Sequence, residues 1–189
     1  MMELGTNGTC SVFPNQSFMD LSLYQFGYGK NEPLSGYGPH IRAHYIFHYI
    51  ISGAGTLKAI SPNGKECTYR VRSGQGFMIY PGQVTTYFAD EIHPWEYTWI
   101  EFDGLHAQEV LRLAGLTVNS PIYRSCNKQI TQQLKDTMLE LAMQQNRSLF
   151  WQIGRLYDFV DCLINSSASK IVSEDSKMGN YYLKIAIMF

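Results

Sequence analysis

The chain has 189 residues, of which 45% are apolar and 16% are charged, the balance of an ordinary globular protein of about one domain. A formal net charge of −1 gives no positive field that would hold nucleic acid non-specifically, so free DNA is a poor partner for this chain. The four cysteines lie far apart, the first 20 residues lack the pattern of a signal peptide, and no apolar run has the length of a membrane span. We therefore expect reduced thiols, no membrane contact and a cytoplasmic location.

The N-terminal region, residues 1–20, is polar and rich in turn residues such as Gly5, Asn7, Gly8 and Pro14. Terminal segments of this composition are usually poorly ordered. The sequence predicts a mobile N-terminal arm here.

Residues 21–104 consist of short apolar or alternating runs separated by glycine and proline. The runs predicted as strands are residues 21–26, 44–52, 56–60, 67–71, 77–80, 84–88 and 95–102, with a loop at 28–39. The turn at Asn63-Gly64 is a hairpin signal. Short strands at this spacing are typical of a β-sandwich or a β-barrel.

After residue 104 the apolar period changes to three and four, which predicts amphipathic helices at residues 105–116, 127–145 and 149–164. A short break near Asn146 makes the last two an antiparallel hairpin. The second helix of the hairpin carries apolar residues around much of its circumference, so we expect residues 127–166 to form a homodimer surface within a helical dimerisation region at 105–166. The alternative is that the hairpin packs only on its own barrel.

Residues 166–177 are polar and serine-rich, as in a linker. Residues 181–189 begin a new apolar-periodic segment that stops before it could pack on a partner. We expect region 167–189 to be a linker followed by the start of a domain that the chain does not contain.

Metal chemistry is disfavoured by the spacing of the histidines. His44 and His48 share a face of their strand but lie roughly 13 Å apart at about 3.3 Å per residue, too far to bind one metal ion. The later strand has Thr85, Thr86 and Tyr87 where a histidine ligand would be needed. No cofactor is expected.

Catalytic motifs are also lacking. The sequence has no G-x-S-x-G and no Walker loop, and Gly27-x-Gly29 is followed by a loop rather than a helix. Glu101 and Asp103 resemble a carboxylate pair, but exposed charges at the end of a strand are the commoner interpretation. We therefore expect no enzymatic activity.

Aromatic residues offer a different kind of site. Trp95, Tyr97 and Trp99 have the same parity on one strand, and Tyr87 lies on the preceding one. Flat rings with a few polar groups hold sugars, and Arg42 and His48 could supply those polar groups. The alternative is that the rings only fill a barrel core, with His48 a satisfied core histidine.

Three stretches together resemble a known family: GPHIRAHYIFHYIISGAG at 38–55, GQGFMIYPG at 74–82, and YFAD at 87–90 with PWEYTWIEF at 94–102. They are similar to the N-terminal sensing domain of AraC-type transcription regulators, in the branch that controls oligosaccharide operons in Gram-positive bacteria. The resemblance runs from about residue 21 to 164. It implies a mostly β fold with α, a cupin-type (jelly-roll) β-barrel at 21–104 followed by a helical hairpin. It also implies that residues 181–189 lead into a missing helix-turn-helix DNA-binding domain.

The resemblance also implies site residues. In the family's arabinose sensor the stacking Trp, the pocket Tyr and the pocket His correspond to Trp99, Tyr87 and Tyr97 of this sequence. The pocket Arg has no match, because Gly38 stands at its position, although Arg42 is close and could substitute. This difference argues against arabinose as the ligand but not against another sugar.

The expected ligand-binding residues are Arg42, His48, Tyr87, Trp95, Tyr97 and Trp99. The expected function is sensing of a sugar or oligosaccharide effector by a homodimer that contacts DNA only through the absent C-terminal domain. The alternatives are a cupin-fold sugar isomerase or epimerase, and a structural cupin whose lumen is filled by its own side chains.

Overall fold

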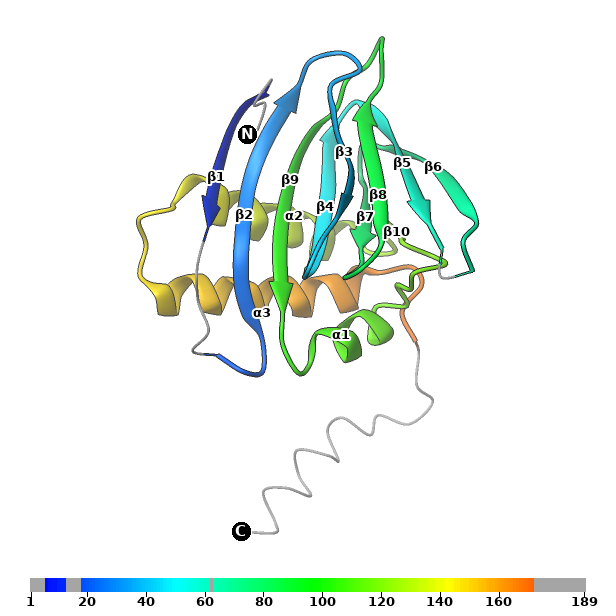
Figure 1. The fold of residues 1–189 in the computed structure, drawn as a ribbon. Helices are drawn as coiled ribbons and strands as arrows, with labels where there is room; N and C mark the ends of the chain where they lie inside the picture. Colours follow the sequence, from blue (N-terminus) through cyan, green and yellow to red (C-terminus); the bar gives the residue numbers. More distant parts are fainter. Residues whose placement is uncertain (1–5, 13–17, 62, 172–189) are drawn as a thin grey trace, which may run out of the picture.

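Two antiparallel sheets face each other in the computed structural model, which describes residues 6–12, 18–61 and 63–171 (Figure 1). The larger sheet has the order β1 (Thr6–Val12), β2 (Ser22–Asn31), β9 (Glu96–Asp103), β4 (Tyr45–Ser52), β7 (Gln75–Ile79) and β10 (Ile122–Arg124). The smaller sheet has the order β3 (Gly36–Ile41), β8 (Val84–Ala89), β5 (Ala54–Ile60) and β6 (Glu66–Arg72). This is the predicted jelly-roll barrel of the cupin type.

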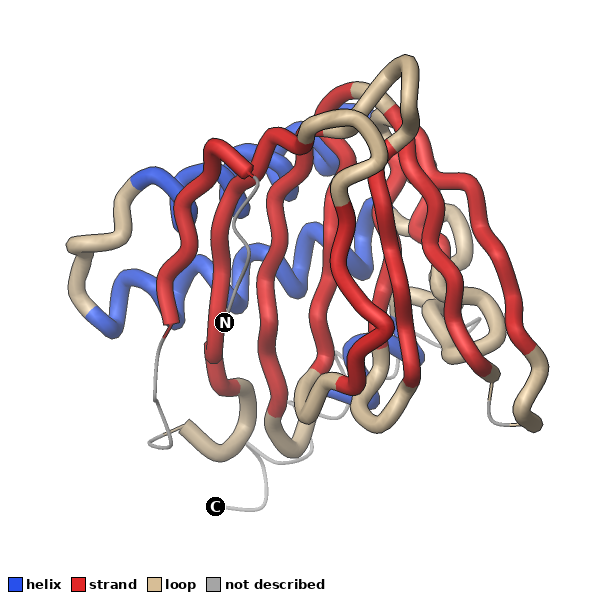
Figure 2. The backbone as a smooth tube through the Cα atoms, turned by 45° about the horizontal axis from the view of Figure 1, so that its top comes forward, coloured by secondary structure: helices blue, strands red, loops and turns tan. Residues whose placement is uncertain are grey.

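Helices follow β9 in the chain; the last two cover the outer face of the six-stranded sheet, and the first lies below the lower ends of the strands (Figures 1 and 2). They are α1 (Ala107–Leu113), α2 (Lys128–Met143) and α3 (Leu149–Ser166). The side chain of Asn127 accepts from the Ile130 N–H, and that of Ser148 accepts from the Trp151 N–H, so both long helices begin at a capping residue. The predicted helical hairpin is confirmed: α2 is one residue shorter at its start and two at its end, whereas α3 begins as predicted and extends two residues further.

Strand alternation divides the interior into two cores. On β4, Phe47 and Tyr49 face the helices, where Leu134, Met138 and other apolar side chains of α2 and α3 cover them. Ile46, His48 and Ile50 face the smaller sheet instead. There they join a set of side chains that we call the lumen cluster, which comprises Ile46, His48, Ile50, Leu57, Val71, Phe77, Ile79, Tyr87, Ala89, Trp95 and Ile122 with Tyr37, Tyr69, Tyr97 and Trp99 packed against them.

The N-terminal region differs from the prediction. Residues 6–12 form β1, which pairs along its whole length with β2 from Thr6 opposite Asn31 to Val12 opposite Gln25. The Thr9 hydroxyl also donates to the Ala142 carbonyl at the end of α2, at 3.2 Å. Backbone pairing with an exposed sheet edge holds this polar segment, which side-chain composition does not reveal.

The region predicted as a loop at 28–39 is also largely strand. β2 extends to Asn31, and β3 begins at Gly36. Glycine and proline lowered the expectation of a strand here, but β3 lies at the edge of its sheet and has an irregular register between Tyr37 and His40, where Pro39 is tolerated.

The serine-rich region after α3 begins inside the folded domain rather than as a linker. Ser167 is fully buried, and its hydroxyl donates to the Ala114 carbonyl at 2.7 Å. The Ile171 N–H donates to the Leu113 carbonyl at 3.1 Å, so residues 167–171 are fixed against the end of α1. The predicted linker and missing-domain segment at 172–189 lie outside the described residues, and among the residues described no helix is long and apolar enough to cross a membrane.

Candidate functional site

The structure brings together the six residues that the sequence singled out. His48 comes from β4, Tyr87 from β8, and Tyr97 and Trp99 from β9, where Trp99 lies directly opposite His48 and Tyr97 opposite Ile50. Trp95 precedes β9 and belongs to the same lumen cluster. Arg42, just before β4, reaches this cluster with its guanidinium 4.7 Å from the centre of the Tyr37 ring. The common direction of Trp95, Tyr97 and Trp99 is as predicted.

Aromatic rings in the lumen cluster contact one another in a continuous series. His48 stacks on Phe77 with ring centres 4.5 Å apart and planes 8° apart. It also lies 4.9 Å from Tyr87 and 6.5 Å from Trp99. Tyr97 lies 5.5 Å from Trp99 and 5.9 Å from Trp95. Flat faces of this kind are suited to stacking on a planar or ring-shaped ligand.

Exposure divides these rings into two groups. Trp95 and His48 are each 1% exposed and Tyr87 is 5% exposed, so they form a packed inner end. Tyr97 and Trp99 are only partly buried. The inner rings therefore fill the barrel core, as the structural alternative predicts. Tyr97 and Trp99 retain exposed surface that a ligand can contact.

Two glycines of β2 lie beside these outer rings. A Cβ atom at Gly27 would lie 2.5 Å from Cζ2 of Trp99, and one at Gly29 would lie 3.6 Å from the Tyr97 ring. Gly27 therefore leaves the space that the indole occupies, because any side chain there would overlap it. Within the motif Gly27-x-Gly29, Gly27 makes room for the Trp99 ring, a role that the sequence analysis did not predict.

Some of the predicted site residues carry buried polar atoms that have no hydrogen-bond partner among the described residues. Nε of Arg42, Nδ1 of His48 and Nε1 of Trp95 are buried and have no hydrogen-bond partner among the described residues. Buried polar groups are nearly always hydrogen-bonded, and each one left without a partner carries a desolvation penalty. Each of these nitrogens therefore keeps a hydrogen-bonding capacity that no described residue satisfies.

A charged cluster closes one end of this site. Glu101 accepts from Arg42 at 3.4 Å and lies 3.1 Å from Nδ1 of His44, which stacks on Tyr24 at 3.7 Å. Glu101 is 7% exposed. The interpretation of Glu101 as an exposed strand-end charge was wrong, because parity turns the residues at 97, 99 and 101 of β9 to the inside of the barrel.

The environment shifts the pKa of several of these groups. Burial, and secondarily the positive charge of Arg42, lowers the pKa of His48 well below 6.5, so its imidazole is neutral. Burial raises the pKa of Tyr97 to about 12 and also raises that of Tyr87, where the nearby Tyr97 acts in the same direction. At neutral pH these side chains act as neutral hydrogen-bonding groups.

Further residues near the site were missed from sequence. Gln25 on β2 lies opposite Glu101, and its amide donates to Sγ of Cys10 on β1 at 2.8 Å. Tyr37 of β3 stacks on Tyr87 with ring centres 5.7 Å apart. The strand parity of Gln25 relative to Gly27 could have indicated its direction, but the pairing of β1 and the position of β3 could not be found from local pattern.

Metal binding finds no support in the arrangement of side chains. Within residues 6–12, 18–61 and 63–171, no group of three or more His, Cys, Asp or Glu side chains is placed to hold a metal ion. His44 and His48 are separated as expected: His44 contacts Glu101 and His48 lies among the inner rings.

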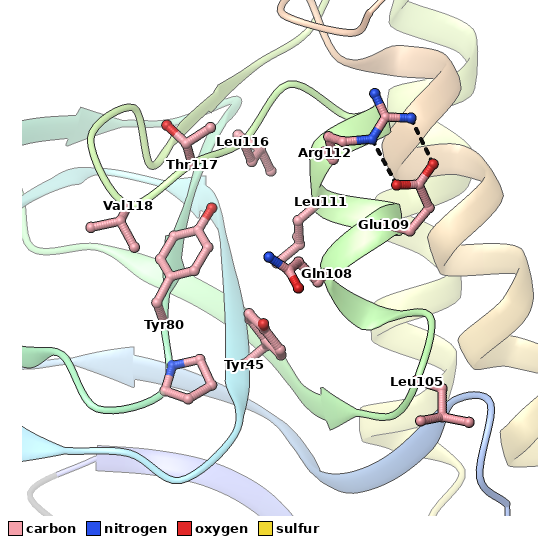
Figure 3. A pocket seen from close by; sticks show the side chains of 11 residues that line it. Tyr45, Tyr80, Leu105, Gln108, Glu109, Leu111, Arg112, Leu116, Thr117 and Val118 are labelled. Carbon is pink, nitrogen blue, oxygen red and sulfur yellow. Dashed lines mark hydrogen bonds and ion pairs between the residues drawn. The ribbon is translucent and has the colours of Figure 1, made fainter.

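A cavity of about 710 Å³ lies elsewhere, between α1 and the side of the barrel that carries Tyr45 and Tyr80 (Figure 3). Figure 3 shows these two tyrosines facing Gln108 and Leu111 of α1, with the ion pair between Arg112 and Glu109 at the rim. Tyr45 and Tyr80 contact the core under the helices, not the lumen cluster. None of the six predicted site residues lines this cavity.

A comparison with known protein families shows the family to which the chain belongs. The family described as "AraC-like ligand binding domain" matches residues 22–153, which include β2 to β10, the rings of the lumen cluster and the charged cluster. The chain belongs to this family.

Curated relatives of this AraC-like domain are operon regulators, one of them named for a raffinose operon. The Msm operon regulatory protein of Streptococcus mutans serotype c is 26% identical over 166 residues, which is 87% of this chain and 58% of that protein. The raffinose operon transcriptional regulatory protein RafR of Pediococcus pentosaceus is 30% identical over 109 residues, 56% of this chain and 37% of that protein. The chain thus spans only part of the length of these relatives.

Solved structures similar to this AraC-like domain include variants of oxalate decarboxylase from Bacillus subtilis. One is 16% identical, covers 57% of this chain and 28% of that chain, and has a TM-score of 0.45. Another is 12% identical, covers 90% of this chain and 37% of that chain, and also has a TM-score of 0.45.

Proposed function

We propose that this AraC-like domain is the ligand-sensing and dimerisation part of a transcription regulator and binds a sugar or oligosaccharide between its two sheets. The relative named for the raffinose operon supports a saccharide effector, and both relatives support a regulatory rather than an enzymatic role. In this proposal Trp99 and Tyr97 form the stacking surface, and Arg42, His48, Tyr87 and Trp95 supply or support the polar contacts.

The observation that carries the proposal is the position of the unpartnered nitrogens of Arg42, His48 and Trp95. They lie among rings that are partly accessible at Tyr97 and Trp99. Sugar hydroxyls accept and donate hydrogen bonds while sugar ring faces are apolar, so such a ligand satisfies the buried nitrogens and covers the rings at once.

Strand β1 is the proposed route from ligand to output. Cys10 is hydrogen-bonded to Gln25 near the site, and the neighbouring Thr9 is hydrogen-bonded to the last turn of α2. A ligand that contacts the β2 side of the site would change the stability of β1 on that edge and, with it, the end of the helical hairpin. About 5.5 kcal/mol of differential affinity would drive such a switch from 1:99 to 99:1.

The outer face of α3 is the proposed homodimer surface. Most of its apolar residues are buried against the barrel, including Leu156, Phe159 and Val160. Phe150 and Tyr157 remain 77% and 46% exposed, two turns apart on one face of the helix. Gly154 lies between them with no atom within 4 Å of where its Cβ would be, so a second helix could approach closely there. DNA contact is assigned to a region that lies C-terminal to the described residues.

The experiment that tests the sensing role is a binding titration of the purified chain with mono-, di- and trisaccharides, arabinose and raffinose included. We expect one saccharide to bind and to raise the unfolding temperature, because a ligand at 100 times its Kd stabilises the folded state by about 2.7 kcal/mol. Trp99→Ala should abolish binding, whereas Trp151→Ala on α3 removes the same side chain outside the site and should not. If no saccharide binds, or if the two variants bind alike, the proposal is wrong.

A further inference from the structure

The charged cluster at the end of the lumen bears on which saccharides can bind. Its formal charges come from Arg42 and Glu101, which form an ion pair at 3.4 Å, with His44 at 3.1 Å from the other carboxylate oxygen. The side chains of Arg42 and Glu101 are 15% and 10% exposed, so both groups are largely removed from water. The Arg42 guanidinium is also held over the Tyr37 ring.

These contacts leave a particular set of hydrogen-bonding groups for a ligand. Nη1 of Arg42 donates to Glu101, whereas Nε has no partner among the described residues and remains a donor. The Glu101 carboxylate, with two oxygens and several lone pairs, remains an acceptor. A donor and an acceptor held side by side suit a hydroxyl group, which accepts one hydrogen bond and donates another.

A carboxylate or phosphate on the ligand does not suit this pair. It could accept from Nε of Arg42 but has no proton to donate to Glu101, and it would bring a second negative charge beside a buried one. Like charges placed together in a site of low exposure are strongly unfavourable. The positive charge of Arg42 is already balanced within the protein.

We infer that Glu101 is a specificity-determining residue that makes this site select an uncharged saccharide over its acidic analogue, an inference that rests on the proposed function. Arg42 then acts as a hydrogen-bond donor to a hydroxyl rather than as a receptor for an anion. His44 positions Glu101, since it holds the carboxylate oxygen that does not contact Arg42. Specificity arises from the unfavourable contact that Glu101 makes with an acidic ligand.

The test measures affinity for matched pairs of sugars that differ only in an acid group, such as galactose with galacturonate and glucose with glucuronate. The panel extends to any oligosaccharide that binds and to its oxidised, acidic derivative. We expect the acidic member to bind wild-type protein at least about tenfold more weakly, the scale of a like-charge contact. In Glu101→Gln the difference should shrink or reverse, because the amide oxygen can still accept from a hydroxyl while the negative charge is gone.

The matched control is Glu96→Gln on the same strand, where the carboxylate bonds to Tyr28 and Ser52 rather than to Arg42. It removes the same charge and should leave the neutral-to-acidic ratio unchanged. Arg42→Gln provides a second variant with the opposite expectation: the remaining charge of Glu101 should widen the ratio.

Each outcome decides between the two proposals. Equal binding of neutral and acidic sugars by the wild type would overturn the role of Glu101 but leave saccharide sensing in place, as would binding of acidic sugars alone. If Glu101→Gln folds and its ratio of neutral-sugar to acidic-sugar affinity equals that of the wild type, the role of Glu101 is also overturned. If Glu101→Gln does not fold, the ratios of the wild type and of Arg42→Gln decide the question. Failure of every sugar of both classes to bind would instead remove the proposed function, and this inference with it.

Discussion

Replacing Gly27 with alanine should disturb the site more than the same change two residues along the strand. A Cβ atom added at Gly27 would lie 2.5 Å from the Trp99 ring and 2.2 Å from the Thr9 carbonyl oxygen of β1. A Cβ atom added at Gly29 would make an ordinary contact, 3.6 Å from the Tyr97 ring. Gly27→Ala therefore forces either the indole or β1 to move, and Gly29→Ala does not.

The magnitudes follow from these contacts. Inserting a methyl group into a packed region costs about 1–3 kcal/mol, and here one neighbour is a large ring and the other is backbone. Neither glycine has a positive φ, so alanine in place of Gly29 meets no backbone strain. Gly29→Ala should even stabilise the fold by up to about 1 kcal/mol by restricting the unfolded chain. We expect a difference of at least about 1 kcal/mol between the two variants.

Urea denaturation followed by tryptophan fluorescence and by circular dichroism measures this difference. A double variant, Gly27→Ala with Trp99→Ala, separates the contributions: removing the ring should relieve the part of the penalty that Trp99 causes and leave the part that comes from Thr9. Equal stability of Gly27→Ala and Gly29→Ala would refute the conclusion that Gly27 holds space for the indole. A double variant with an undiminished penalty would place the whole effect at β1.

Three further predictions concern pH and assembly. The pKa of His48 lies well below 6.5 in the folded protein, so the unfolded chain takes up a proton there first as the pH falls. The free energy of unfolding should therefore decrease below about pH 6.5 by up to about 1.4 kcal/mol per pH unit. His48→Gln should remove this slope in urea titrations at about pH 5–7. Hydrogen bonds from the His93 N–H and from Arg70 lower the pKa of Asp90 from 3.8 to about 2. The contribution of its carboxylate to folding stability should therefore be lost as the pH falls from about 4 to 2. Thermal melts of Asp90→Asn should lack this part of the loss of stability in acid. Sedimentation should find a dimer for the wild type and a folded monomer for Phe150→Ser/Tyr157→Ser; a variant that remains dimeric would exclude this face of α3 as the interface.

Local sequence pattern was sufficient to predict most of the barrel and the convergence of the site. The strict alternation of β4 and β9 placed His48 and Trp99 on the inner face, because a strand reverses its side-chain direction at every residue. The spacing of three and four gave the hairpin of α2 and α3, whose capping residues Asn127 and Ser148 lie at the predicted breaks.

The remaining features depend on contacts between distant parts of the chain. β1 is a strand because β2 offers it an open edge, and residues 167–171 are fixed because α1 and the chain near Arg124 offer backbone partners. Glu101 is buried because Arg42 and His44 meet it from another segment. None of these partners can be identified from the residues that surround each segment, since pairing across the sheet is set by tertiary packing.

The central claim, that Trp99 forms the binding surface for a saccharide effector, is tested most directly by calorimetric titration of wild type, Trp99→Ala and Trp151→Ala with the saccharide panel. The account predicts that wild type and Trp151→Ala bind the same saccharide with similar affinity and that Trp99→Ala does not bind it. Binding that survives the loss of Trp99, or absence of binding by the wild type across the panel, would contradict the account.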